Sequence, residues 1–187
     1  MADECLSYKK IPKIIMDEPE YNIQIVHTTD NMDLYHGNVV STLIDNYEII
    51  ASAYAVKEGY CVVLKTVNSV IGYNDFLVNI NEKHKSGTCS YNITLEHEKK
   101  HINAYLSVIK DFKSELKNSL FNAADSIMPI FVKSKEELDL AIDKMNLELQ
   151  KHPELILVKQ KIKAAEEIRN KKIDQQNDSY KMISCED

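Results

Sequence analysis

The sequence lacks an excess of basic charge, because 29 acidic residues outnumber 23 lysine and arginine residues and the formal net charge is −6. Nucleic acids and anionic membrane surfaces need a basic footprint on the proteins that bind them. No nucleic-acid partner is therefore expected. No apolar run reaches the roughly 18 residues of a membrane-spanning helix, so we expect no membrane span either.

The sequence also lacks a CxxC pair, because its four cysteines, Cys5, Cys61, Cys89 and Cys185, lie far apart. This spacing argues against a cysteine zinc site and against a thioredoxin motif. The even count leaves two interpretations open, which are two disulfides in an exported protein or four buried free thiols. No signal peptide precedes the chain as written.

The first half of the chain shows mainly strand patterns. Residues 1–20 contain two prolines and predict an irregular lead-in. Alternating or continuous apolar runs predict strands, and one stretch has apolar residues at helical spacing. We expect strands at residues 21–28, 60–71 and 76–81, turns at 72–75 and 83–87, and a helix at 42–56.

Long helical patterns dominate the second half. Residues 90–122 contain no proline or glycine and carry apolar residues at the helical period. Ser134 followed by Glu137 is a capping-box signature that predicts a helix to about residue 151. Pro153 breaks or begins a further helical run, which extends to about residue 173. We expect an α+β fold, in which a small antiparallel sheet and one long helix precede C-terminal helices. Residues 1–130 would form the core and residues 131–187 a helical extension packed on it, as a single domain overall.

One motif is typical of a catalytic metal site: His97-Glu98-Lys99-Lys100-His101, which lies within the longest helical pattern. Residues four apart lie on one face of a helix, so His97 and His101 can bind the same zinc ion. Glu98 lies beside the first ligand, where a carboxylate can act as the general base on water. Tyr105, one turn further, could donate a hydrogen bond to an oxyanion or simply pack in the core. The alternative for the motif is a solvated polar turn.

A catalytic zinc site usually has a third protein ligand, and the motif helix does not supply it. Ser107 stands where a third histidine would complete a longer motif. Asp111 and Glu115 lie on a suitable face, but about 15 and 21 Å along the helix axis from His101. The third ligand must therefore come from another segment. The candidates are Asp125, His27, His36, His84 and His152.

Several stretches resemble a bacterial family of predicted secreted zinc-dependent proteases. They are residues 86–91 (SGTCSY), 95–101 (LEHEKKH) and Tyr105, together with residues 59–61 (GYC) before an alternating apolar run. Members of that family have a small-residue-Cys-x-Tyr turn that leads into a His-Glu-x-x-His helix. The resemblance covers residues 59–122 well and the rest of the chain faintly. Ile173-Asp174, Tyr180 and Cys185 resemble the closing segment of that family more loosely.

The resemblance implies a zincin-like fold, Zn²⁺ as cofactor, and a periplasmic or secreted location with the signal peptide removed. His97 and His101 would be metal ligands, with Glu98 as the base. It also implies disulfides Cys61–Cys89 and Cys5–Cys185, one of three possible pairings. The leading hypothesis is a zinc-dependent peptidase or amide hydrolase that acts on a peptide or protein. The alternatives are a non-catalytic exported module that binds metal or a protein, and a cytosolic helical adaptor. The oligomeric state stays open.

Overall fold

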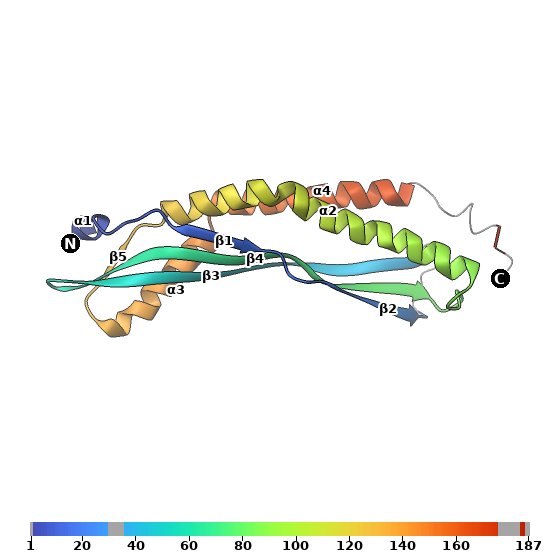
Figure 1. Cartoon of the computed structure of the whole chain (residues 1–187), viewed down its shortest axis with the longest axis horizontal. Helices are drawn as coiled ribbons and strands as arrows, with labels where there is room; N and C mark the ends of the chain where they lie inside the picture. The colour runs from blue at the N-terminus through green and yellow to red at the C-terminus, as the bar shows by residue number, and fades with distance from the viewer. Residues whose placement is uncertain (1, 30–35, 176–183, 186–187) are drawn as a thin grey trace. The chain divides into compact units, whose positions relative to one another are not determined.

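The computed structural model describes residues 2–29, 36–175 and 184–185, so most of the loosely matching tail lies outside the described residues. It has an α+β fold with one sheet, several helices and one long helix, as the sequence predicted (Figure 1). The elements are α1 (Ala2–Leu6), β1 (Lys13–Asp17), β2 (Asn22–Thr28), β3 (Gly37–Val56), β4 (Gly59–Asn81), α2 (Cys89–Ser126), β5 (Ile130–Val132), the 3₁₀ turn η1 (Lys135–Glu137), α3 (Leu138–Gln150) and α4 (Pro153–Gln175).

Strand β4 is the centre of the sheet, because each of the other four strands pairs with it. β1 and β2 both run parallel to β4, and residue n of either strand pairs with residue n plus 53. β5 pairs with β4 in the antiparallel sense. β3 is joined to β4 by Lys57 and Glu58 alone, the short connection of a hairpin. The prediction of a small antiparallel sheet was therefore wrong, since local pattern does not reveal which distant segments align in parallel.

The strand predictions need three corrections. Residues 1–20, predicted as an irregular lead-in, contain β1. Residues 42–56, predicted as a helix, belong to β3, where half-buried and exposed residues alternate along much of the strand. Its β-branched and aromatic residues favour this pleated surface over a helix. Residues 60–71 and 76–81 are parts of one strand, because Gly72 continues β4 instead of opening a turn. Gly72 has a φ of +154°, and a Cβ there would lie 2.8 Å from Cδ of Pro19.

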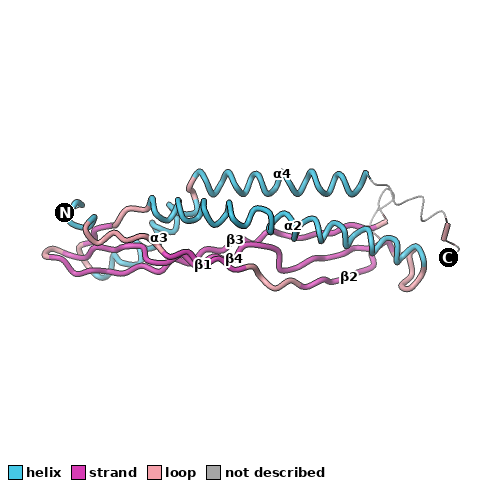
Figure 2. The backbone as a smooth tube through the Cα atoms, turned by 45° about the horizontal axis from the view of Figure 1, so that its top comes forward, coloured by secondary structure: helices cyan, strands magenta, loops and turns pink. Residues whose placement is uncertain are grey.

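The long helices begin where the sequence gives start signals. Thr88 caps α2, since its Oγ1 accepts a hydrogen bond from the backbone N–H of Tyr91 at 3.3 Å. Pro153 is the first residue of α4, a position that needs no N–H donor. Ser134 precedes η1 but makes no side-chain cap, whereas Glu137 accepts a hydrogen bond from the N–H of Lys133. Figure 2 shows α2 and α4 side by side.

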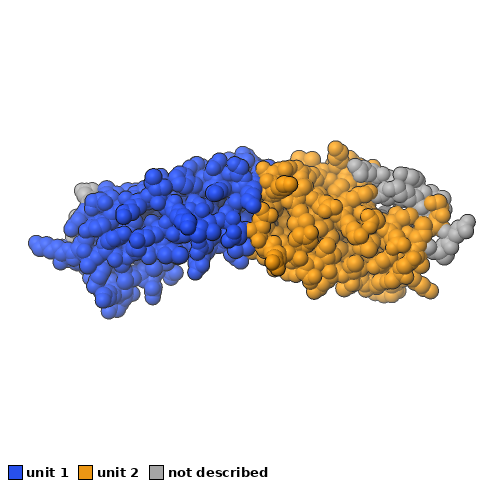
Figure 3. Space-filling model, viewed as in Figure 1, with its two compact units in different colours: residues 1–17, 45–71, 112–161 blue, residues 18–44, 72–111, 162–187 orange. Residues whose placement is uncertain are grey.

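The residues group into two compact units, drawn in separate colours in Figure 3. Unit 1 comprises residues 1–17, 45–71 and 112–161, and its core holds fully buried Val67, Leu120, Met145, Leu149 and Leu155. Unit 2 comprises residues 18–44, 72–111 and 162–187. The division into a core at 1–130 and an extension at 131–187 stays a prediction.

Unit 2 buries one face of its part of β4 against α2. Phe76, Val78 and Ile80 alternate along β4 and are at most 1 % exposed. A row of α2 residues faces inward at the helical period, and we call it the buried stripe of α2: Thr94, Glu98, Ile102 and Ile109. Three of these four residues are less than 4 % exposed, and one of the three is a carboxylic acid.

All four cysteines form disulfides, one in each unit. Cys5 pairs with Cys61 in unit 1, and Cys89 pairs with Cys185 in unit 2. The pairing that the resemblance implied was therefore wrong. Two disulfides are compatible with a secreted or periplasmic protein. Within the described part of the chain, no helix combines the length and the apolar character needed to cross a bilayer.

Candidate metal centre

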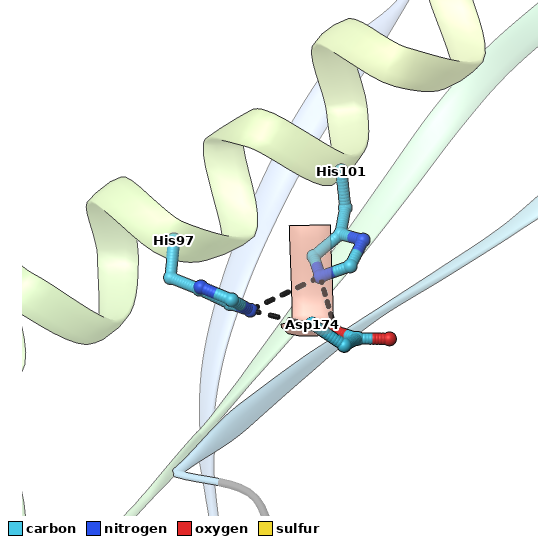
Figure 4. A group of neighbouring side chains, drawn as sticks. All are labelled: His97, His101 and Asp174. Atoms are coloured by element: carbon cyan, nitrogen blue, oxygen red, sulfur yellow. Dashed lines mark hydrogen bonds and ion pairs between the residues drawn. The ribbon is translucent and has the colours of Figure 1, made fainter. Parts of the chain in front are cut away.

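Three side chains of unit 2 converge on one point between α2 and α4 (Figure 4). His97 and His101 project from successive turns of α2, and Asp174 projects from the last turn of α4. Nε2 of His101 lies 3.2 Å from Nε2 of His97 and 3.1 Å from Oδ1 of Asp174. Nε2 of His97 lies 3.6 Å from the same carboxylate oxygen.

This group could hold a metal ion. Two neutral imidazole nitrogens and a carboxylate oxygen offer lone pairs, and lone pairs at such short range repel one another unless a proton or a metal ion lies between them. The side chain of His97 is 21 % exposed and that of His101 is 12 % exposed, whereas that of Asp174 is 47 % exposed. The histidines are therefore held by the fold, while the carboxylate lies on the solvent side. No other group of this kind occurs among the residues that the structure describes.

A row of polar contacts fixes the turn of α2 that carries His97 and His101 against α4. Nδ1 of His101 lies 2.9 Å from Oδ1 of Asn170, one turn before Asp174. Further along, Arg169 donates hydrogen bonds to Ser107 and to Asp111. The two helices are antiparallel here, since higher numbers on α2 meet lower numbers on α4.

Glu98 is buried beside the group rather than exposed at its edge. The residue is 2 % exposed. A Cβ atom added at Gly37 would lie 2.9 Å from Oε1 of Glu98. Its Oε2 has no hydrogen-bond partner among the described residues. Burial, with a smaller contribution from the negative charge of Asp174, raises the pKa of Glu98 to about 8. A carboxyl group with such a pKa can both accept and release a proton near neutral pH.

Tyr105 follows His101 by one turn of α2 and packs among aromatic rings. Its ring centroid lies 5.1 Å from that of Tyr73 and 6.2 Å from that of Phe76. Burial and the charge of Glu166 raise the pKa of Tyr105, whereas a hydrogen bond with the side chain of Asn170 lowers it. Its contacts agree with the core packing that the sequence left open, and its role as an oxyanion donor stays a prediction.

None of the five candidates for a third ligand belongs to the group. His27 stacks on Tyr91, and Nδ1 of His36 lies 2.9 Å from Nε2 of His84. Asp125 lies in unit 1 near the end of α2, where its backbone carbonyl accepts a hydrogen bond from Lys9. His152 lies in unit 1, directly before α4.

The motif does not indicate Asp174, because Asp174 lies on another helix, 73 residues after His101. A signal for it exists in α4, where Glu166, Asn170 and Asp174 recur every four residues and share one helix face. Buried Ile162 lies one turn before this row. A buried apolar stripe that continues as polar residues predicts a polar partner on the facing element.

Comparisons with protein families, with curated proteins and with solved structures find no match for the chain. The resemblance to secreted zinc-dependent proteases therefore stays a prediction.

Proposed function

We propose that the chain is a zinc-dependent hydrolase of the peptidase type. One observation carries the proposal: His97, His101 and Asp174 present three donor atoms to one point, and the buried carboxyl group of Glu98, the residue after His97, is influenced by the negative charge of Asp174. The two disulfides support a periplasmic or secreted site of action, where peptides or proteins would be the substrates.

The spacing of the donor atoms supports zinc as the metal. Four tetrahedral ligands at about 2.0–2.2 Å from zinc lie about 3.3–3.6 Å from one another. The three separations here are 3.1, 3.2 and 3.6 Å, which approximate one face of such a tetrahedron. Two imidazoles and one carboxylate also suit zinc chemically, and three protein ligands leave a fourth position open, as catalytic zinc sites do.

Glu98 would move the proton during hydrolysis. Zinc, when bound, would supply a Lewis acid that polarises the carbonyl and lowers the pKa of water. Glu98 would accept a proton from the attacking water at Oε2 and deliver it to the leaving amine nitrogen as the C–N bond breaks. Tyr105 would donate a hydrogen bond to the oxyanion.

A non-catalytic metal-binding or protein-interaction module is the second candidate. The depth of Glu98 favours it, because a residue that is 2 % exposed within the buried stripe of α2 meets little solvent. In that case the metal would clamp α2 to α4, and Glu98 would be a core residue.

The metal claim is tested by zinc analysis of protein purified without a histidine tag. We expect about one zinc per chain, lost in His97→Ala and in Asp174→Ala. The matched controls are His27→Ala and Glu167→Ala, which remove an exposed histidine and an exposed acid of unit 2 outside the group. A wild-type protein without zinc under metal-replete conditions contradicts the proposal.

The catalytic claim is tested by Glu98→Gln with a fluorogenic casein substrate. We expect zinc to stay bound while the rate of cleavage falls at least about 100-fold, the contribution typical of a general base. If zinc binds and Glu98→Gln leaves cleavage unchanged, or if wild type cleaves nothing, the second candidate replaces the first.

A further inference from the structure

We infer that Asn170 is a positioning residue of the metal centre. Its amide oxygen holds His101 in the tautomer that carries hydrogen on Nδ1, so that the lone pair of Nε2 faces His97 and Asp174. The consequence for metal binding rests on the proposed function, whereas the tautomer itself does not.

The contact between Asn170 and His101 allows one direction of donation. Oδ1 of Asn170 lies 2.9 Å from Nδ1 of His101, and an amide oxygen can only accept a hydrogen bond. Nδ1 must therefore carry the hydrogen. A neutral imidazole has one N–H, so Nε2 keeps its lone pair, and that atom is the one at 3.1 Å from Asp174.

The side chain of Asn170 also hydrogen-bonds with Tyr105, one turn after His101 on α2. This second partner restricts how the amide of Asn170 can turn, while its Oδ1 lies 2.9 Å from Nδ1 of His101.

The chain places Asn170 where both ligand-bearing helices meet. Asn170 and Asp174 are one turn apart on α4, as His97 and His101 are on α2. Asn170 bonds to Nδ1 of His101, while Asp174 approaches Nε2 of the same ring. A hydrogen-bond partner on the ring nitrogen that does not bind the metal orients a metal-binding histidine. Loss of such a partner typically weakens metal binding about 10- to 100-fold.

The tautomer is tested first in metal-free protein, by long-range ¹H–¹⁵N correlation NMR of His101 at a pH where the ring is neutral. Wild type and Asn170→Asp, which keeps an acceptor, should carry the hydrogen on Nδ1. Asn170→Leu, of similar shape but without an acceptor, should shift it substantially to Nε2. Asn103→Leu is the matched control, because Asn103 is an exposed asparagine of α2 in the same unit.

Zinc affinity, measured by competition with a chelator, is the second readout. Asn170→Leu should bind zinc about 10- to 100-fold more weakly, while Asn170→Asp and Asn103→Leu stay near wild type. Hydrogen on Nε2 in wild type, or Nδ1–H retained in Asn170→Leu, overturns the inference. Equal zinc affinity of Asn170→Leu and wild type also overturns it. If wild type binds no zinc, the proposed function fails, and the tautomer still decides the role of Asn170.

Discussion

Replacing Glu98 by glutamine removes an ionisable group from the buried stripe of α2, and it should change how the stability of the metal-free protein depends on pH. Burial raises the pKa of Glu98 from an ordinary value of 4.5 to about 8 in the folded chain. Between these two values the unfolded chain releases the proton while the folded chain keeps it. The unfolded state therefore binds fewer protons, and the free energy of unfolding falls as pH rises.

The expected size follows from the two pKa values. Each pH unit between about 5 and 8 should cost wild type about 1.4 kcal/mol relative to Glu98→Gln, and the difference should level off above pH 8. The total is at most about 5 kcal/mol, a large part of the stability of an ordinary domain. Below about pH 4 both proteins are neutral at this position, so the difference should become constant.

Urea unfolding followed by far-UV circular dichroism measures this difference, with a chelator present to keep both proteins metal-free. The difference between the two curves cancels the contribution of every group that the substitution does not affect, so it reports mainly on Glu98. Glu96→Gln is the control, because Glu96 is an exposed acid on the same helix. A wild-type curve that stays parallel to that of Glu98→Gln from pH 5 to 8 would refute the reasoning.

Three further predictions concern stability. Replacing Cys5 and Cys61 by serine should cost about 4 kcal/mol, because their disulfide closes a loop with a sequence separation of 56, and urea unfolding under non-reducing conditions measures the loss. Leu120→Ala should cost about 2–5 kcal/mol because the side chain is fully buried, whereas Leu140→Ala, at a site that is 72 % exposed, should stay within about 0.5 kcal/mol. Equal losses would contradict the assigned core. Gly72→Ala should cost about 1–3 kcal/mol through its φ of +154°, and an unchanged melting temperature would show that the strand tolerates a side chain there.

The sequence predicts the helical half of the fold better than the sheet. Helix α2 and the start of α4 at Pro153 follow from periodicity and breakers, which are local signals. β3 was mistaken for a helix because a half-buried strand with apolar residues on both faces lacks strict alternation. The parallel pairing of β1 and β2 with β4 joins segments about fifty residues apart, and no local pattern encodes such a partner.

The candidate site was predictable only in part. Spacing alone puts His97 and His101 on one helix face, and the structure brings Asp174 to them from near the C-terminal end of the chain. The carboxylate that lies beside the two histidines is determined by how α4 packs against α2, and local sequence patterns do not specify this packing. The disulfide partners were open for the same reason, since four cysteines allow three pairings. The burial of Glu98 could have been read from the period of the stripe, in which it occupies a central position.

The split of the metal group between two helices links ion binding to a conformational equilibrium. His97 and His101 belong to α2 and Asp174 to the end of α4, so all three donors meet only while α4 is docked on α2. On the proposed function, the apparent dissociation constant for zinc would equal the intrinsic constant divided by the docked fraction. A substitution that weakens docking, such as removal of the Arg169 contacts with Ser107 and Asp111, would then lower zinc affinity without touching a ligand. Zinc affinity would thereby also measure how firmly the C-terminal helix is held.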